Sequence, residues 1–396
     1  MNSKNHNSTN NCHICNYDQI INIDNFGSLP RTTSDARPWK RGGKLAYCSS
    51  CGCVQKVFEK NYIIECETIY SNYSIYHQSQ GGQEQLDFKE NGTSICRSAR
   101  VLKSVINKID LPNEGKLLDV GCGNGNLLKS CSKLLPSLSL YGHDINIKFH
   151  EFVSSILNVK TFYTDNINTI DECFDIITLH HTLEHIINPI KFLKNIQNLI
   201  HQEGYLIISV PDFIRNPFDL IVADHCSHFQ INSIEKVLGF AGFKTVLIDN
   251  SFPQKDLTIV AKKAYAVAGD LKKMDDKLYF EKILKVTNWL FQTREEASKI
   301  ALKRKFGLFG ASLSSLWLMS DLKNYVEFVV DEDKNKIGQQ FFECQIVNLT
   351  DLPEDANIYL PFSYNIACLI KKRLSRYNVN FYLPPPLMIN IGDKND

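Results

Sequence analysis

The stretch Lys116–Leu128 constrains the fold more than any other part of the 396-residue chain. Its sequence, KLLDVGCGNGNLL, is an apolar run that ends in Asp119. A turn follows with glycine at every second position: Gly121, Gly123 and Gly125. This pattern predicts a buried strand, a tight loop and a helix. Because glycine tolerates positive φ and lets backbone N–H groups approach closely, we expect the loop to bind a nucleotide-like ligand.

The spacing of these residues indicates the charge of that ligand. The G-x-G-x-x-G fingerprint of dinucleotide sites admits a pyrophosphate, whereas this loop has the spacing D-x-G-x-G-x-G. A carboxylate at Asp119 would repel a phosphate and can receive a cationic ammonium group. The loop therefore favours a ligand that carries a positive charge.

Residues from about 96 to 262 alternate strand and helix patterns, which is typical of an open, mostly parallel sheet. Ligands of such sheets bind at the carboxyl ends of the strands. The expected strands are Lys116–Val120, Leu138–His143, Lys160–Tyr163, Phe174–Leu179, Gly204–Val210, Lys244–Asn250 and Asp256–Ala261.

Two acids follow successive strands of this set. Asp144 closes the second strand, where a carboxylate can accept hydrogen bonds from both ribose hydroxyls, and Asp165 follows the third, where it can meet an adenine amino group. A surface-loop aspartate is the alternative for each. Both acids follow strand ends, as the glycine loop does, and this shared position favours an adenosine ligand.

The fourth strand runs into HHTLEHI, with His180, His181, Glu184 and His185. A metal site is one interpretation, but H-x-x-E-H belongs on a helix and needs a further ligand. We favour strand-end polar residues that face the cofactor, with His181 pointing inward. Glu184 and His185 can equally cap the following helix.

The first cysteines of the chain have metal-ligand spacing. Cys12-x2-Cys15 and Cys48-x2-Cys51 form two knuckles that together supply four thiolates, a set suited to structural Zn²⁺. Four unrelated thiols and a redox C-x-x-C are the alternatives. Cys53 and His13 are nearby spare ligands. We expect the zinc to fold a small lobe.

Composition and charge limit the partners and the location that we expect for the chain. The formal net charge is +1, with 43% hydrophobic and 22% charged residues, so nothing favours nucleic acid as a partner. The first residues resemble no signal peptide, and no apolar run reaches the ~18 residues of a membrane span. We expect a reduced, cytoplasmic chain without a membrane partner, monomeric or weakly self-associating.

Two further segments suggest the organisation outside the sheet. Tyr70, Tyr73 and Tyr76 would share one helical face, which favours packing against a neighbouring domain over lining the site. Residues 270–305 have helical spacing, and FGLFGAS at 306–312 begins a second βαβ outline. We place Asn365 of that unit at a strand end.

In order, DVGCGNG, GHD, TDN, HHTLEHI and VPD, followed by IVADHCSHF and AGF, resemble class I S-adenosylmethionine (SAM) methyltransferases. With the cysteine knuckles, the chain resembles the sugar C-methyltransferase type. The resemblance implies an α/β fold whose seven-stranded, Rossmann-like methyltransferase domain stands between a zinc lobe and a smaller C-terminal α/β domain. The expected segments are a zinc-binding lobe (1–66), a linker (67–95), the methyltransferase domain (96–264), a helical linker (265–305) and a Rossmann-like domain (306–396). SAM would then contact Asp119, Gly121, Gly123, Gly125, Asp144, Asp165 and His180.

In that family the segment after the fifth strand reads approximately Y-x-E-H-x-x-Y-F-S and carries the catalytic base. Here His225 matches the histidine, and Asp224 replaces the glutamate. Val222 and His228 stand where the family has tyrosines. We expect His225, Asp224 and His181 to be catalytic, with a structural role in the lid as the alternative for His225. The departures at Val222 and Asp224 leave carbon and oxygen methylation open.

The resemblance implies methyl transfer to a sugar or nucleotide-linked sugar in glycan or secondary-metabolite synthesis, with the C-terminal domain helping to bind the acceptor. Two alternatives remain. One is an RNA or protein methyltransferase that grips its substrate with the zinc lobe, and the other is a non-catalytic SAM-binding scaffold.

Overall fold

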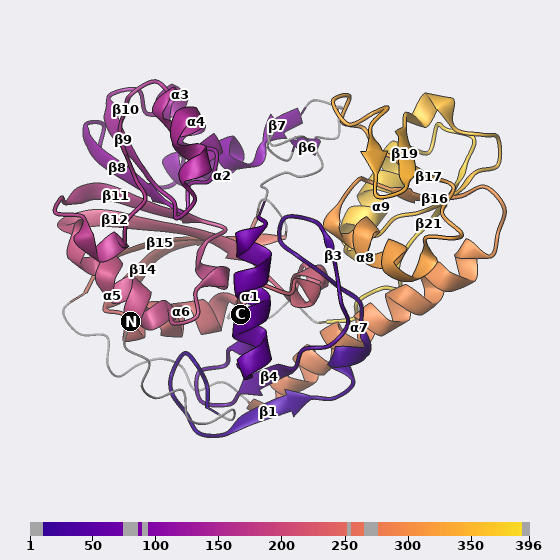
Figure 1. The fold of residues 1–396 in the computed structure, drawn as a ribbon, viewed down its shortest axis with the longest axis horizontal. Coiled ribbons are helices and arrows are strands. Elements are labelled where there is room, and N and C mark those ends of the chain that lie inside the picture. Colours follow the sequence, from indigo (N-terminus) through magenta and orange to yellow (C-terminus); the bar gives the residue numbers. More distant parts are fainter. Residues whose placement is uncertain (1–10, 74–85, 89–93, 252–254, 265–275, 390–396) are drawn as a thin grey trace.

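The computed structural model describes residues 11–73, 86–88, 94–251, 255–264 and 276–389 (Figure 1). The expected positions of Tyr76 and of the final residues 392–396 therefore lie outside the described residues. Within the described chain, no helix has both the length and the apolar character needed to cross a membrane.

A seven-stranded sheet forms the centre of the region between residues 96 and 264, in the order β10-β9-β8-β11-β12-β15-β14. Five neighbouring strands, β10 to β12 in that order, are parallel, and β15 is antiparallel to both of its neighbours. The strands are β8 (Gly115–Val120), β9 (Leu138–His143), β10 (Val159–Tyr163), β11 (Phe174–His180), β12 (Ile200–Pro211), β14 (Phe243–Asp249) and β15 (Asp256–Lys263). The predicted α/β class and all seven strands are confirmed. The largest difference in strand start is at β12, which begins four residues before the expected Gly204.

The helices beside this sheet are α2 (Arg97–Ile106), α3 (Asn126–Leu134), α4 (His150–Ser154), α5 (Pro189–Leu199) and α6 (Ile231–Phe240). Both faces of the sheet are buried, because Leu117 packs in one apolar cluster while Leu118 and Val120 pack in another. Local signals fix the helix starts. Asn188 accepts a hydrogen bond from the Lys191 N–H (3.1 Å), and Pro189 occupies the first turn of α5.

A smaller antiparallel sheet, β1-β4-β5-β13, carries the N-terminal lobe. Its strands are β1 (Ile20–Ile23), β4 (Leu45–Cys48), β5 (Val54–Lys56) and β13 (Ser227–His228). β13 comes from the segment after β12, so the region of the large sheet supplies the last strand of the lobe's sheet. The pair β2 (Arg31–Thr32) and β3 (Pro38–Trp39) adds a bridge from Thr32 to Val222.

Helix α1 (Lys60–Ser71) stands between the large sheet and the C-terminal part (Figure 1). The expected boundary at residue 66 falls inside this helix. A short pair, β6 (Leu86–Phe88) and β7 (Ser94–Cys96), precedes α2.

The long helix α7 (Asp276–Ala301) leads into the C-terminal domain, so residues 276–301 form one helix. This domain has the sheet order β18-β19-β17-β16-β20-β21. Its elements are β16 (Phe306–Phe309), α8 (Leu313–Leu322), β17 (Phe328–Val330), β18 (Gln340–Phe341), β19 (Cys344–Val347), β20 (Asn357–Tyr359), α9 (Tyr364–Arg373) and β21 (Asn380–Tyr382). Asn365 lies in the first turn of α9 and not at a strand end, because the turn after β20 reaches the helix cap at Ser363.

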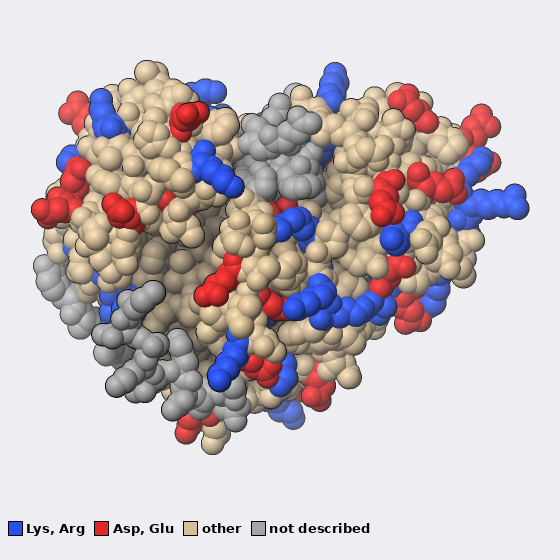
Figure 2. Space-filling view, in the orientation of Figure 1, with Lys and Arg blue, Asp and Glu red and all other residues tan. Residues whose placement is uncertain are grey.

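One apolar core joins the lobe, the segment after β12 and the C-terminal domain. Phe218 packs edge-on against Trp289 of α7 and Trp317 of α8, with ring centroids 5.4 and 5.6 Å apart. The Trp317 indole N–H donates to the Pro30 carbonyl of the lobe (2.9 Å). Phe218 thereby packs the segment after β12 against the C-terminal domain, and Trp317 joins that domain to the lobe. Figure 2 shows acidic and basic side chains interspersed over this face of the molecule, in keeping with a net charge of +1.

Candidate active site

The glycine loop has the backbone that its sequence predicts. Gly121, Gly123 and Gly125 have φ values of +75°, +51° and +77°. A Cβ on Gly121 would lie 2.4 Å from the Thr182 hydroxyl, and one on Gly125 would lie 2.4 Å from Ile156 Cδ1. Both conformation and space therefore require glycine at these two positions.

Asp119 lies buried at the end of β8 and accepts a hydrogen bond from the Thr178 hydroxyl of β11 (2.6 Å). Burial, reinforced by nearby Asp144, raises the pKa of Asp119 to about 7. A cation bound beside the loop would return this carboxyl to its charged form. The Asp119 carboxylate, as a buried hydrogen-bond acceptor, thus fits a ligand with an ammonium group.

Asp144 braces the glycine loop from the end of β9. One carboxylate oxygen accepts from the Gly123 N–H and the other from the Asn146 N–H, each at 2.9 Å. Burial raises the pKa of Asp144. Asp165 is exposed after β10, and its backbone carbonyl lies 2.8 Å from His143 Nε2. The Asp144 side chain therefore contacts the glycine loop directly, whereas Asp165 contacts β9 through its backbone carbonyl.

A row of buried polar side chains crosses the carboxyl ends of β11 and β12 and the amino end of the antiparallel strand β15. His180 pairs with Ser209 across two strands, and Ser209 pairs with Thr258 on the third. Asp256 lies two residues from Thr258, and Glu184 follows β11. Each has one buried polar atom without a hydrogen-bond partner in the described chain: His180 Nδ1, Ser209 Oγ, Thr258 Oγ1, Asp256 Oδ1 and Glu184 Oε2. We call these five residues the polar row.

His181 lies beside the polar row in a left-handed conformation (φ +53°). Its Nδ1 is 3.1 Å from Glu184 Oε1, and its Nε2 is 3.7 Å from Asp256 Oδ2. Burial and the Arg97 charge lower the pKa of His181, but the two carboxylates outweigh them and raise it. Arg97 Nε donates to Asp256 at 2.8 Å. The structure thus places His181 directly after β11, between the carboxylates of Glu184 and Asp256.

His225 is held by an acid that the sequence analysis missed. Its Nδ1 is 2.6 Å from Asp219 Oδ1, and the His225 residue is only 7% exposed. Burial lowers the pKa of His225, but Asp219, Glu184 and Asp224 outweigh burial and raise it. The ring lies edge-on to His185, with centroids 4.6 Å apart.

Asp224 contacts the N-terminal lobe. It accepts hydrogen bonds from the backbone N–H (2.9 Å) and the hydroxyl (2.5 Å) of Ser34. His185 Nδ1 lies 3.1 Å from the Asp224 carbonyl and 3.0 Å from the Tyr70 hydroxyl of α1. Tyr70 therefore reaches the site region, whereas the sequence favoured a packing role. Glu184, His185 and His225 also bring one possible metal-ligand atom each within 4.8 Å of one another.

The four predicted cysteine ligands converge in the N-terminal lobe. Their sulfurs all lie within 4.8 Å of one another, with Cys12 and Cys51 at 3.6 Å and Cys15 and Cys48 at 3.5 Å. A tetrahedral S4 site with bonds of about 2.3 Å separates sulfurs by about 3.8 Å, so the donor set fits zinc. The spare cysteine, Cys53, points its sulfur toward the Val54 carbonyl at 3.3 Å.

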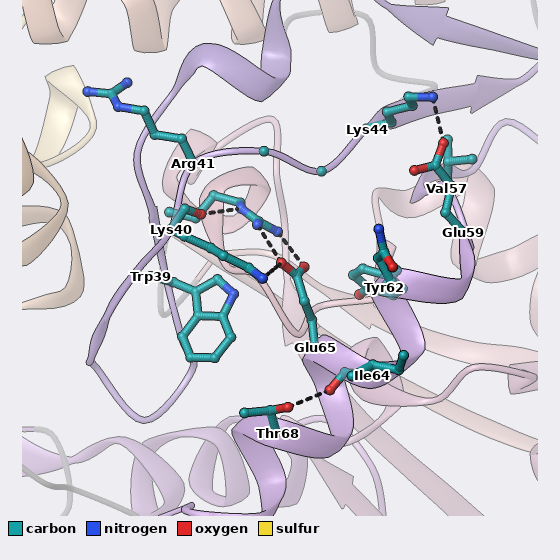
Figure 3. Close-up of a pocket in the computed structure, with 14 residues that line it drawn as sticks. Trp39, Lys40, Arg41, Lys44, Val57, Glu59, Tyr62, Ile64, Glu65 and Thr68 are labelled. Carbon is teal, nitrogen blue, oxygen red and sulfur yellow. Dashed lines mark hydrogen bonds and ion pairs between the residues drawn. The ribbon is translucent and has the colours of Figure 1, made fainter.

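A pocket of about 490 Å³ opens between α1 and the loop after β3 (Figure 3). Arg31 binds Glu65 in its wall through two hydrogen bonds of 3.0 Å, and Lys40 lies 3.4 Å from the same carboxylate. The Trp39 indole N–H is buried there without a partner in the described chain. The lining includes Arg31, Lys40, Arg41 and Lys44 against Glu59 and Glu65, with Trp39, Tyr62 and Ile64 as apolar surface. The lining has four cations and two carboxylates, and each cation is ion-paired: Arg31 and Lys40 with Glu65, Lys44 with Glu59, and Arg41 with Asp321 outside the lining.

Several residues of the site were not predictable from motif spacing. Asp219 lies in a short 3₁₀ helix (Pro217–Ile221) after β12, and Asp256 is the first residue of β15, the strand next to the edge strand β14. Ser209 looked like an ordinary strand residue. An acid inside the apolar stretch FDLIV, six residues before the candidate histidine, was the available sequence signal for Asp219.

Strand-end acids, a glycine loop and a parallel sheet together define the class of the central domain as a cofactor-binding α/β domain. Residues 96–248 match the family model described as a methyltransferase domain. This match and the fold identify the region as a methyltransferase domain of the class that uses SAM.

Known proteins resemble part of the chain. It is 30% identical over 117 residues to the ubiquinone biosynthesis O-methyltransferase of Glaesserella parasuis serovar 5 (strain SH0165), covering 27% of this chain and 50% of the relative. It is 27% identical over 161 residues to the mitochondrial enzyme of that name from Candida albicans, covering 37% and 49%. The chain thus spans about half the length of the curated relatives it matches.

Solved structures match a comparable share of the chain. The mitomycin 7-O-methyltransferase MmcR aligns with a TM-score of 0.37 at 14% identity, covering 42% of this chain and 54% of that one. The SAH-bound calicheamicin methyltransferase CalO1 aligns with a TM-score of 0.36 at 17% identity, with the same shares.

Proposed function

We propose that this chain is a SAM-dependent methyltransferase that transfers a methyl group to a carbon or an oxygen of a sugar or nucleotide-linked sugar. The observation that carries the sugar acceptor is the polar row at the ends of β11, β12 and β15. Buried polar atoms are nearly always paired in folded proteins, and an unpaired one costs about 1–3 kcal/mol. His180 is assigned to SAM, and the other four such atoms, beside the glycine loop, suit an acceptor rich in hydroxyl groups.

The glycine loop, Asp119 and Asp144 would hold SAM, because they combine close backbone approach with acids for an ammonium group and for ribose hydroxyls. When bound, SAM supplies a methyl group on a positively charged sulfur and departs as a neutral thioether. Asp165 and His180 would complete its adenosine side.

The remaining task of the protein is to take up the proton that the acceptor loses. Asp219 accepts hydrogen bonds only, so His225 Nδ1 carries a hydrogen and its Nε2 has the free lone pair. As the new C–C or C–O bond forms, the acceptor proton passes to Nε2, and Asp219 stabilises the resulting imidazolium. His181 would orient the acceptor beside Asp256, and Asp224 would hold the segment against the lobe.

We also propose that Cys12, Cys15, Cys48 and Cys51 bind one structural Zn²⁺. Four thiolates close the coordination sphere, so the ion would stabilise the lobe and take no part in methyl transfer. The sheet that it stabilises includes β13, which follows His225 within three residues.

Removing this zinc should destabilise the lobe. We expect Cys48→Ser to lose the metal and lower the unfolding midpoint, because metal binding in small lobes contributes several kcal/mol of folding free energy. Metal content by mass spectrometry and thermal unfolding measure both. Cys53→Ser is the matched control, since that thiol faces a backbone carbonyl, and it should keep its zinc. Equal zinc content in wild type and Cys48→Ser would refute the ligand set.

The pocket beside α1 supports a nucleotide-linked acceptor. Its cations suit phosphates, and Trp39 offers a ring face and an unpaired N–H to a base. Thr68 lines the pocket, and Tyr70 two residues later contacts His185, so one helix separates the pocket from the site.

Uridine diphosphate is a direct probe of this pocket. We expect Trp39→Ala and Lys40→Ala each to weaken its binding about three- to tenfold in calorimetry, the size of one lost stacking or partly exposed charge contact. Lys299→Ala, on the exposed face of α7, should bind as wild type does. Equal affinities of uridine diphosphate for the wild type and all three variants would refute a nucleotide-linked acceptor. The proposal of a sugar acceptor would stand.

The proposed function itself is tested by incubating the protein with SAM and a panel of nucleotide-sugars, free sugars, an RNA, a protein extract and a catechol. The proposal predicts turnover with a sugar, and NMR of the product gives the methylated atom. Turnover confined to RNA, protein or catechol would overturn the sugar assignment, and SAM binding without turnover on any acceptor would favour a scaffold.

A further inference from the structure

A buried chain of hydrogen bonds connects the N-terminal lobe to His225. It begins at Lys56, the last residue of β5, whose side chain is enclosed although it carries an amine. Lys56 Nζ lies 3.1 Å from His228 Nε2, and His228 Nδ1 lies 2.6 Å from Asp219 Oδ2. The other oxygen of Asp219 meets His225 Nδ1 at 2.6 Å. Four side chains from three elements thus form one uninterrupted path.

The chemistry of the groups fixes the direction of each bond in this path. The Asp219 carboxylate has two oxygens and only accepts, so both histidines present Nδ1–H to it. His228 Nε2 then has a lone pair, which accepts from the Lys56 amine. Lys56 also donates to the Leu220 carbonyl, which holds the amine in place. The Lys56 amine and both nitrogens of His228 are paired, and within the described residues Nε2 of His225 is the imidazole nitrogen of the path without a hydrogen bond.

We propose that Lys56 and His228 are positioning residues of methyl transfer, which act through Asp219 to keep His225 in its Nδ1–H form and to set the pH at which its Nε2 takes a proton. The proposal rests on the proposed role of His225 as base. It adds a contribution from the N-terminal lobe, because β5 and β13 pair directly and bring Lys56 to His228. No covalent bond changes along the path, and the acceptor proton stops at His225.

The charges around the path determine in which direction Lys56 shifts the pKa of His225. Burial, together with the Arg31 charge, lowers the pKa of Lys56 to about 7, and burial and Lys56 lower the pKa of His228 to about 4. A positive Lys56 opposes a second positive charge at His225. The groups facing His225 are Asp219, Glu184, Asp224, His185 and His228, and those facing Lys56 are Arg31, Asp219, Asp224, Cys226, His228 and the Phe26 ring. Loss of the Lys56 charge should therefore raise the pKa of His225.

The test is an NMR titration of the ¹⁵N-labelled imidazoles in the full chain, which needs no acceptor. In Lys56→Met we expect the His225 midpoint to move upward by about half a pH unit to one unit, the range of a single buried charge. Lys60→Met is the control, since that lysine at the start of α1 is exposed and lies outside both the path and the pocket lining. An unchanged His225 midpoint in folded Lys56→Met would overturn the proposal.

Two variants at His228 provide a second test of the path if Lys56→Met folds poorly. His228→Gln can donate its amide N–H to Asp219 and accept from Lys56, so the His225 midpoint should stay near wild type. His228→Phe has the shape but neither bond, and the midpoint should rise. Equal midpoints in both variants would contradict the path. Failure of the proposed base would appear separately, as unchanged turnover in a His225 variant.

Discussion

Replacing His225 by alanine is expected to slow methyl transfer about 10²- to 10⁴-fold, the usual contribution of a positioned general base. SAM should bind the variant as it binds wild type, because the described contacts of His225 lie with Asp219 and His185 and not with the glycine loop. Initial rates on an acceptor found in the screen, together with calorimetry of SAM, separate the two effects.

The matched control for this variant is His201→Ala, an exposed histidine near the start of β12. It should retain full rate. Wild-type turnover in His225→Ala would leave the segment after β12 without a catalytic role.

The same base predicts a pH dependence. His225 must be neutral to accept a proton, and Asp219 contributes to the raised pKa of that histidine, so the rate should fall as pH drops through it. In Asp219→Asn this support is lost, and the acid limb should move to lower pH while the maximal rate also falls. An acid limb at the same pH in both proteins would assign it to another group.

Replacing Asp144 by alanine is expected to weaken SAM binding about ten- to a hundredfold. The carboxylate braces the Gly123 and Asn146 amides in the unliganded chain, and the proposed ribose contact would be lost as well. A hydrogen bond to a charged group contributes about 1.5–3 kcal/mol, which corresponds to this range. Isothermal titration with SAM measures it directly.

Two comparisons make the Asp144 result specific. Asp165→Ala should weaken SAM less, since its side chain is exposed and its backbone makes the described contact. Asp171→Ala, an exposed acid on the loop before β11, should have no effect. If Asp144→Ala and Asp171→Ala bound SAM equally well, the strand-end acid could not be a cofactor contact.

The sheet and its glycine loop could be predicted because their signals are local. Lys116–Val120 is an apolar run, Gly121 and Gly125 sit where a Cβ would collide, and the other strands follow the same alternation. The fold class and the loop backbone therefore follow from short stretches of sequence.

The surroundings of His225 could not be predicted in the same way. Asp219 lies in a segment without helical or strand periodicity, and Lys56 is separated from His228 by more than 170 residues. Only the pairing of β5 with β13 brings these groups together. Tyr70 was assigned to packing for a related reason, because helical spacing defines a face but not its neighbour.

Transfer of a ¹³C-labelled methyl group from SAM to a nucleotide-sugar panel, followed by ¹³C NMR, tests the central claim most directly. The account predicts a labelled methyl on a sugar carbon or oxygen with wild type, and about 10²-fold less or below with His225→Ala. Label that appears on no sugar, or that appears equally with both proteins, would contradict it.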